Sequence, residues 1–282
     1  MTSGSTHRKN RAYLPFLLPG LAGVTLFTFL PFADSLRRSF FTSSGRFAGL
    51  ENFAVTIDNE AFRLAVWNTA RFTAVSLPLL IVSAFILAYL LCRLKFCGVI
   101  RSVLLFPMAV PTAVLVLIWK ILFSDNGCIN GILASHGIEG IQFLDSGASF
   151  WLLVMSFLWK NLGYTVLLWM TGIIGLPASI TEAARVDGAN ERQVLVKIML
   201  PNLRPTLYTI TIITFLNSFK VFREAFLVAG SYPHKSMYLL QHLFNNWFVN
   251  LDLDKMAAAS VIVFAVIFAA IMLLRKVWNN EN

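Results

Sequence analysis

The amino-acid sequence predicts an all-α, polytopic membrane protein, because its apolar residues are abundant and gathered in long blocks. Of its 282 residues, 57% are hydrophobic and only 13% are charged, whereas soluble domains carry about 25% charged residues. The blocks are roughly 20 residues long, the length that an α-helix needs to cross a bilayer core of ~30 Å. Helices are expected because backbone groups in lipid must be satisfied within the segment.

Six apolar segments provide the expected transmembrane helices, within one transmembrane domain over residues 13–278. They lie at about 13–33, 68–92, 99–123, 150–172, 206–230 and 256–278. Residues 1–12 and 279–282 are short tails. The first segment follows a basic tail, as the core of a signal peptide would, but it is long and lacks a clear cleavage site. We therefore expect it to be retained as the first helix.

The connecting segments differ in character. Pro107 and Pro111 lie within the third segment and predict a kink there. Residues 34–67 have apolar residues spaced for one or two amphipathic helices. Residues 124–149 are rich in Gly, Asp, Ser and Asn and are predicted to be loop.

The distribution of basic residues predicts the orientation. Twelve Lys and Arg residues lie in the tails and loops on the side of the two termini, against seven on the opposite side. Cytoplasmic loops carry the excess of positive charge, so both termini are expected in the cytoplasm. The same rule explains the net charge of +9 without a nucleic-acid partner.

A polar insert between the fourth and fifth segments, residues 178–201, reads ASITEAARVDGANERQVLVKIMLP. Ser179 and Glu182 are spaced as a capping box, which predicts the start of a short helix. Gly188 is a natural end for that helix. A second box at 190–193 predicts the start of another helix. The insert is therefore expected to be two short helices joined by a glycine corner.

Small residues around the corner suit close approach to a partner, while neighbouring charges would set its orientation. From these residues alone, the insert is either a docking element or a cap that shields the helix ends. A DNA-binding helix-turn-helix is disfavoured by the membrane context and by the lack of a basic recognition face.

The spacing of the insert resembles the EAA signature of ABC importer permeases. Glu182-Ala183-Ala184 is followed after three residues by Gly188, and after nine more by Ile198-Met199-Leu200-Pro201. Asp187-Gly188-Ala189 resembles the sugar-permease branch. Further likeness lies at 159–164, 202–206, 220–224 and 257–260, so the resemblance covers nearly the whole chain. Residues 230–236 lack the Gly-Gly-Pro stretch that many relatives carry there.

The resemblance implies a type I ABC importer permease fold, with a coupling loop over 177–205 that docks in a cleft of an ATP-binding subunit. The implied partners are a second permease subunit, two ATP-binding subunits and an extracytoplasmic solute-binding protein, in the cytoplasmic membrane of a bacterium. The positions that carry the coupling role are Glu182, Ala183, Ala184, Asp187 and Gly188.

The chain itself is expected to be neither a catalyst nor a nucleotide-binding protein. It has no G-x-x-x-x-G-K-[ST] phosphate loop, and its four His residues show no metal-ligand spacing. No catalytic residue, metal or cofactor is expected here, and ATP and Mg²⁺ would bind the partner ATPase.

Charged residues inside apolar segments usually face a cavity or a partner. Lys160 lies about ten residues into the fourth segment, so ~15 Å deep at 1.5 Å per residue. Lys220 and Glu224 are four apart and could pair. These side chains either line a translocation path for a polyhydroxylated solute, or contact a second subunit or snorkel outward. The full set of path candidates is Lys160, Asn161, Tyr164, Asn217, Lys220 and Glu224.

The function expected is import of a sugar or oligosaccharide by alternating access, driven by a separate ATPase. Lys160 and Lys220 favour an acidic or acylated sugar unless each is paired. The alternatives are an importer permease for another polar solute, an ion-coupled secondary transporter, a membrane-embedded enzyme and a non-transporting scaffold.

Overall fold

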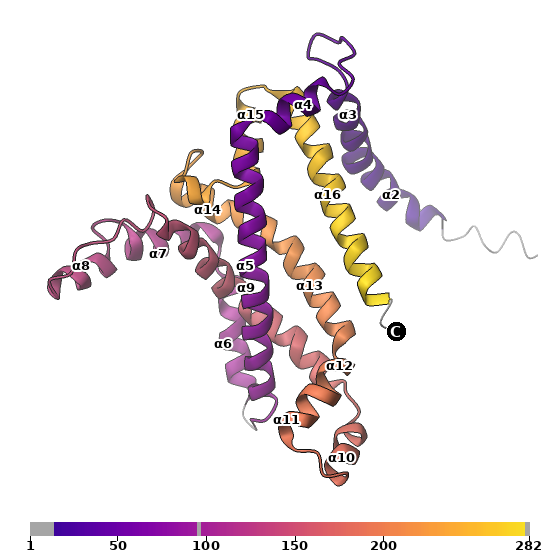
Figure 1. Ribbon diagram of the computed structural model, residues 1–282, viewed down its shortest axis with the longest axis vertical. Helices are drawn as coiled ribbons and strands as arrows, with labels where there is room; N and C mark the ends of the chain where they lie inside the picture. Colours follow the sequence, from indigo (N-terminus) through magenta and orange to yellow (C-terminus); the bar gives the residue numbers. More distant parts are fainter. Residues whose placement is uncertain (1–13, 95–96, 280–282) are drawn as a thin grey trace, which may run out of the picture. The chain divides into compact units, whose positions relative to one another are not determined.

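The computed structural model describes residues 14–94 and 97–279 (Figure 1). Within these ranges the structure is helical, and extended pairing is limited to an isolated bridge between Phe41 and Phe47. The all-α prediction is therefore confirmed. The chain divides into two compact units, which we describe separately. Unit 1 holds the chain up to Asn59 and Trp247–Val277, and unit 2 is built on Glu60–Asn246.

Unit 1 contains two long apolar helical stretches and a short connecting helix. Its first stretch is unbroken through a π-helical turn at Thr25–Phe29. The elements are α2 (Leu14–Val24), α3 (Leu30–Ser39), α4 (Glu51–Asp58) and α16 (Leu253–Asn279).

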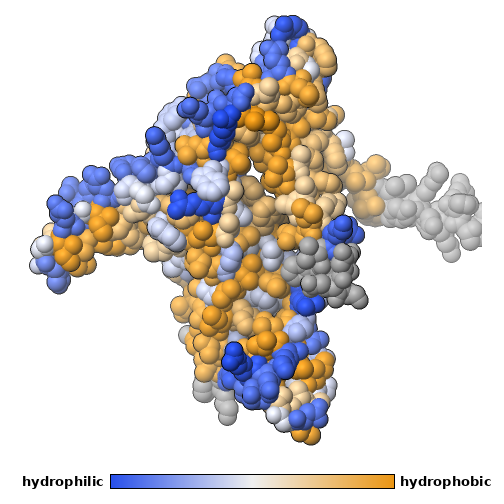
Figure 2. All heavy atoms as spheres, viewed as in Figure 1, coloured by the Kyte–Doolittle hydropathy of each residue, from blue (hydrophilic) through white to orange (hydrophobic). Residues whose placement is uncertain are grey.

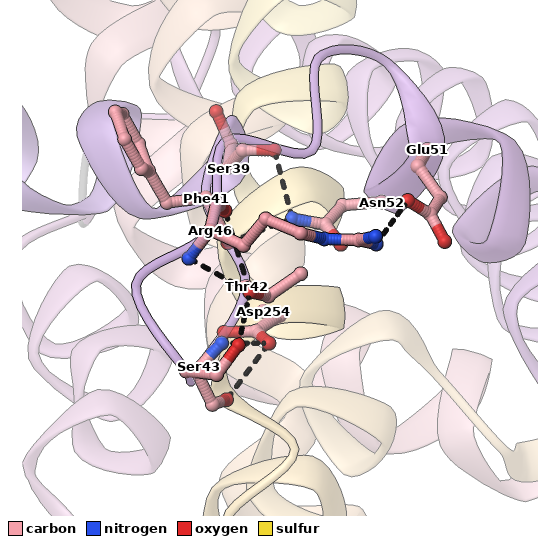
Figure 3. A network of polar contacts seen from close by, with 9 residues as sticks. Ser39, Phe41, Thr42, Ser43, Arg46, Glu51, Asn52 and Asp254 are labelled. Atoms are coloured by element: carbon pink, nitrogen blue, oxygen red, sulfur yellow. Dashed lines mark hydrogen bonds and ion pairs between the residues drawn. The ribbon is translucent and has the colours of Figure 1, made fainter.

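A polar network closes the turn between α3 and α4 (Figure 3). The side-chain amide of Asn52 donates to the carbonyl oxygens of Ser39 at 3.1 Å and Phe41 at 2.9 Å. The carboxylate of Asp254, at the start of α16, accepts hydrogen bonds of 2.7 Å from both the N–H and the hydroxyl of Ser43. These bonds satisfy backbone groups that the helix ends leave without partners.

Unit 2 contains four long or paired helical segments and the polar insert. Its helices are α5 (Glu60–Leu91), α6 (Cys97–Ala109), α7 (Thr112–Phe123), α8 (Cys128–Ser135), α9 (Ala148–Ile174), α10 (Ala178–Val186), α11 (Glu191–Gln193), α12 (Leu200–Asn202), α13 (Arg204–Ser218) and α14 (Phe222–Ala229). A π-helical turn, Val194–Met199, joins α11 to α12, and a 3-10 turn, Phe219–Val221, joins α13 to α14. The boundary between the units falls within α15 (Leu240–Val249), at Asn246 and Trp247.

Among the described residues, five helices are long and apolar enough to cross a membrane. They are Phe16–Ser39, Glu60–Leu91, Thr112–Ser135, Ala148–Ile174 and Leu253–Lys276. The expected span at 206–230 is helical too, but the 3-10 turn interrupts it and its C-terminal half carries three charged side chains. Five of the six expected spans therefore overlap a helix of membrane length, and the remaining one, at 206–230, is an interrupted helix.

The structure of two segments differs from the prediction, which was a single kinked span at 99–123 and loop at 124–149. The helix breaks at Pro111, whose ψ of 138° is extended, so α6 ends before it and α7 begins after it. The break confirms the predicted kink and has the predicted cause, a ring that cannot continue the hydrogen-bond ladder. The prediction that 124–149 is loop throughout is wrong, because Cys128–Ser135 forms α8.

Small residues allow the helices of unit 2 to pack closely. Ala84 and Ala88 of α5 are fully buried. A Cβ placed on Gly163 of α9 would lie 1.7 Å from the backbone oxygen of Leu104 on α6, so only glycine permits that approach. Helices in lipid associate by close packing of this kind, because lipid tails provide no hydrophobic drive between them.

Figure 2 shows hydrophobic side chains along the helices of unit 2 and hydrophilic ones around α10 and α11. On α5, for example, Val82, Ile86 and Leu90 are each more than half exposed. Apolar side chains repeated on one exposed helix face are expected where a helix meets lipid.

Candidate functional site: a charged cavity and a polar helical loop

Unit 2 contains a cavity of about 340 Å³ where α7, α9 and the α13–α14 junction meet. Its lining mixes charged, amide, hydroxyl and aromatic side chains. The lining residues are Met108, Thr112, Ser156, Phe157, Lys160, Asn161, Asn217, Phe219, Lys220, Val221, Phe222, Arg223 and Glu224.

An ion pair between Lys160 and Glu224 joins two helices across this cavity. The Lys160 ammonium donates to Glu224 Oε1 and also to the hydroxyl of Thr112 at 2.9 Å. The Glu224 side chain is only 7% exposed, and its Oε2 has no hydrogen-bond partner among the described residues. A buried charge persists only when it is paired, so this pair ties α9 to α14.

The predicted pairing of Lys220 with Glu224 is wrong. Lys220 instead donates to the amide oxygen of Asn217 at 2.9 Å, and Glu224 turns to α9. Lys220 lies in the 3-10 turn at Phe219–Val221, whereas Glu224 lies in the α-helix that follows. Residues in a 3-10 turn advance about 120° rather than 100° each, so the two residues are not spaced as in one continuous α-helix.

Five of the six path candidates from the sequence come together in this cavity, and Tyr164 does not line it. The set of candidates from the sequence lacked three polar lining residues, Thr112, Ser156 and Arg223. Ser156 lies one helical turn before Lys160 and so on the same face of α9, which was an available signal. Thr112 gave none, since only folding brings α7 against α9.

The polar 177–205 loop turns sharply at Gly188. This residue has a φ of +85°, which L-residues other than glycine adopt at a cost. The Ala189 N–H donates to the Ala184 carbonyl at 2.9 Å, and the Gly188 N–H to the Arg185 carbonyl at 3.0 Å. This pair of backbone hydrogen bonds is a Schellman motif, and it confirms Gly188 as the end of the first helix.

The capping predictions have opposite outcomes. The box at 190–193 is confirmed, because Asn190 and Gln193 exchange side-chain bonds with each other's N–H at 2.9 and 2.8 Å. The box at Ser179 and Glu182 is wrong. The first helix begins earlier, at Ala178, with Pro177 as its N-cap and no side-chain cap. Proline suits the start of a helix because its fixed φ is compatible and its missing N–H is not needed there.

The first helix of the loop, α10, has no buried residue. The coupling positions Glu182, Ala183, Asp187 and Gly188 are exposed and Ala184 is half-buried. Val186 beside them is 86% exposed. An isolated helix face with small and apolar residues facing outward is available to a partner.

A charge cluster ties the loop to the end of α5. The Glu191 carboxylate accepts from Arg185 at 3.1 Å and pairs with Arg93. The Arg93 guanidinium in turn lies 4.4 Å from the ring centre of Tyr89. The hydrogen bond from Arg93, with the nearby charge of Arg185, holds the pKa of Glu191 below its usual value.

The described residues contain no group of three or more His, Cys, Asp and Glu side chains placed to hold a metal ion. The described part of the chain therefore combines membrane-length helices, a charged cavity and an exposed helical loop. An ion pair between Glu191 and Arg93 links that loop to the end of α5. This set of features is that of a helical membrane protein with a polar cavity.

The chain belongs to the family of binding-protein-dependent transport system inner membrane components, whose model matches residues 81–280. The resemblance to ABC importer permeases is thereby confirmed. Members of this family are transport permease subunits, so the chain is a transport component.

Similar proteins cover almost the whole chain. The sn-glycerol-3-phosphate transport system permease protein UgpA of Agrobacterium fabrum is 30% identical over 267 residues, 91% of each chain. The trehalose/maltose transport system permease protein MalF of Thermococcus litoralis is 28% identical over 285 residues, 98% of this chain and 97% of that one.

A solved bacterial ABC transporter involved in import of the acidic polysaccharide alginate contains a chain with a TM-score of 0.83. That match has 19% identity and covers 97% of this chain and 96% of the other. At this identity it shows the fold. The type I importer permease fold expected from the sequence agrees with it.

Proposed function

We propose that this chain is the membrane-spanning permease subunit of a bacterial ABC importer, which moves a sugar or oligosaccharide across the cytoplasmic membrane by alternating access. The observation that carries the proposal is the course of α9. This helix contributes Ser156 and Lys160 to the cavity and ends at Ile174, just before α10 begins at Ala178. A displacement of α10 therefore reaches the cavity wall along one helix.

The 177–205 loop is the coupling loop in this proposal. Glu182, Ala183, Ala184, Asp187 and Gly188 dock in a cleft of an ATP-binding subunit, where the small side chains permit close approach. ATP and Mg²⁺ bind that partner. Closure of the ATPase dimer then moves α10, and α9 responds as a rigid body.

The remaining partners follow from this role. The importer contains a second permease subunit, two ATP-binding subunits and an extracytoplasmic solute-binding protein. The chain spans the cytoplasmic membrane with both termini and the coupling loop in the cytoplasm. The excess of Lys and Arg on that side supports this orientation.

The chemistry of the cavity supports a polyhydroxylated solute. Phe157 and Phe222 offer flat apolar faces, and Asn161 and Asn217 offer amide groups. Glu224 also lines the cavity, and its buried Oε2 has no hydrogen-bond partner among the described residues. The names of the relatives, which include a glycerol phosphate permease and a trehalose/maltose permease, support the same class of solute.

The proposal is tested by uptake in cells that express the full importer. ATP depletion should abolish uptake, whereas an uncoupler should not. Loss of uptake on addition of the uncoupler, with ATP maintained, would instead favour an ion-coupled secondary transporter.

The coupling role is tested by Gly188→Val and Glu182→Lys. Each should dissociate or uncouple the ATPase while the helices stay inserted. Arg192→Gln is the matched control, because it is exposed on α11 but is not a coupling position. Copurification of the ATPase with normal uptake in both variants would show that this loop does not transmit the motion.

A further inference from the structure

The charges of the cavity do not balance. Its lining contains three cationic side chains, Lys160, Lys220 and Arg223, and one carboxylate, Glu224. The Lys160–Glu224 pair accounts for one charge of each sign. Two positive charges are left on the wall of the same cavity.

Neither remaining cation has an acidic partner in the described part of the chain. Lys220 is held by the neutral amide oxygen of Asn217 at 2.9 Å. Arg223 lines the cavity and is exposed, and it makes no ion pair with a described carboxylate. Both lie at the α13–α14 junction, three residues apart, so their side chains can reach one bound group.

Cations inside a membrane domain are costly and mark solute or ion pathways. A neutral sugar would leave both cations without a counter-charge in this cavity. A carboxylate or phosphate would accept charge-assisted hydrogen bonds from both, and the planar guanidinium of Arg223 suits bidentate binding of either group.

We propose that the transported solute is anionic, a polyhydroxylated compound carrying a carboxylate or a phosphate, and that Lys220 and Arg223 bind its charged group. This inference rests on the proposed import function and names the class of solute. Lys160 is held by Glu224 and is not the anion's main partner. The amides of Asn161 and Asn217 then bind the hydroxyl groups.

The charge selectivity of the cavity can be measured without knowing the natural solute. Asn217→Cys is introduced into the whole transporter after Cys92, Cys97 and Cys128 have been replaced by serine. The thiol is then modified with an anionic sulfonatoethyl or a cationic trimethylammonioethyl methanethiosulfonate. Ala134→Cys, exposed on α8 and outside the loop proposed to dock, supplies the reference ratio of the two rates.

A positively charged cavity should raise the anionic-to-cationic rate ratio at Asn217→Cys about tenfold or more over the reference, as focused fields do for charged ligands. Lys220→Met combined with Arg223→Met should remove that preference. Lys120→Met is the control, because Lys120 is exposed on α7 and does not line the cavity. A ratio equal to the reference in the assembled transporter would overturn the proposal, since a second subunit would then supply the missing acidic partners.

Protection of the same thiol identifies the anion. The probes are sn-glycerol 3-phosphate, galacturonate and the neutral sugar maltose, all used at the same concentration. We expect the phosphate or the uronate to slow modification of the thiol at least several-fold more than maltose does. The compound that protects the thiol more strongly shows whether the cavity prefers a phosphate or a carboxylate. Equal protection by all three, or by none, overturns the proposal. ATP-dependent uptake, measured separately, tells failure of this inference from failure of the import function.

Discussion

The cavity and the 177–205 loop both contain carboxylates paired with basic side chains, yet the two pairings have different consequences. Glu224 is 7% exposed where it meets Lys160, whereas Glu191 is 55% exposed where it meets Arg93 and Arg185. Breaking a buried pair leaves a charge without solvent, but exposed pairs contribute little to stability because water replaces the partner. Burial, more than the chemistry of the pair, decides what it does.

The difference fits the roles proposed for the two regions. A pair that holds α9 to α14 must survive while the cavity fills and empties. A pair on a docking surface must be remade whenever a partner binds and leaves. Four predictions test this contrast, from the largest expected effect to the smallest.

Loss of Glu224 should be the most severe change. Glu224→Ala leaves the half-buried ammonium of Lys160 with only the Thr112 hydroxyl as a partner, and removing one partner of a buried pair costs about 3–5 kcal/mol. We expect a large fall in thermal stability of the purified transporter and loss of uptake. The double variant Lys160→Met with Glu224→Gln should recover most of the stability. If Glu224→Ala melts like the wild type, the pair does not hold α9 to α14.

A buried histidine near the cavity should make stability depend on pH. His242 is fully buried, its Nδ1 accepts from the Leu239 N–H at 3.1 Å, and its ring lies 4.8 Å from that of Phe222. Its Nε2 has no partner among the described residues. Burial lowers the pKa of His242 to about 4, so the folded state favours the neutral ring.

The folded protein therefore binds fewer protons than the unfolded chain between that pKa and the ordinary one. The contribution of His242 is complete above about pH 6.5 and is lost as pH falls toward 4, in total about 3 kcal/mol. The melting temperatures of the wild type and of His242→Asn should therefore converge as the pH falls from 6.5 toward 4. Asparagine is chosen because its amide oxygen replaces the Nδ1 acceptor. Parallel curves would exclude His242 as the source.

Gly188→Ala should cost about 1–2 kcal/mol, since a β-carbon is disfavoured in the left-handed region. The space around Gly188 is open, with nothing within 4 Å of an added Cβ, so the cost is local to the backbone. Gly131→Ala in α8 is the control, because that position is equally open but has no positive φ. Similar stabilities of the two variants, by thermal melting, would show that the corner is not strained.

Glu191→Gln should change stability least and transport more. The melting temperature should stay at the wild-type value, because the carboxylate is exposed, while the ATP hydrolysed per solute imported should rise as the link to α5 weakens. Exchange of charges, Glu191→Arg with Arg93→Glu, should restore the ratio in part. An unchanged ratio in Glu191→Gln would place this cluster outside the coupling route.

Local patterns in the sequence predicted much of the architecture. Apolar blocks of membrane length, the glycine end at Gly188, the box at 190–193 and the break near Pro111 are all local, and the structure bears them out. Two of the failed predictions were local rules with a competing local alternative. Pro177 replaced the first capping box, and a 3-10 turn replaced the α-helical spacing between Lys220 and Glu224.

The sequence by itself determined that this chain is a helical membrane permease with a polar helical loop, because length, hydropathy and motif spacing are properties of short segments. Only the tertiary structure decided which charges compensate each other. Glu224 meets Lys160 from 64 residues away, and no periodicity reports a contact between separate helices. That pairing leaves Lys220 and Arg223 without acidic partners in the cavity, and it is the reason to expect an anionic solute.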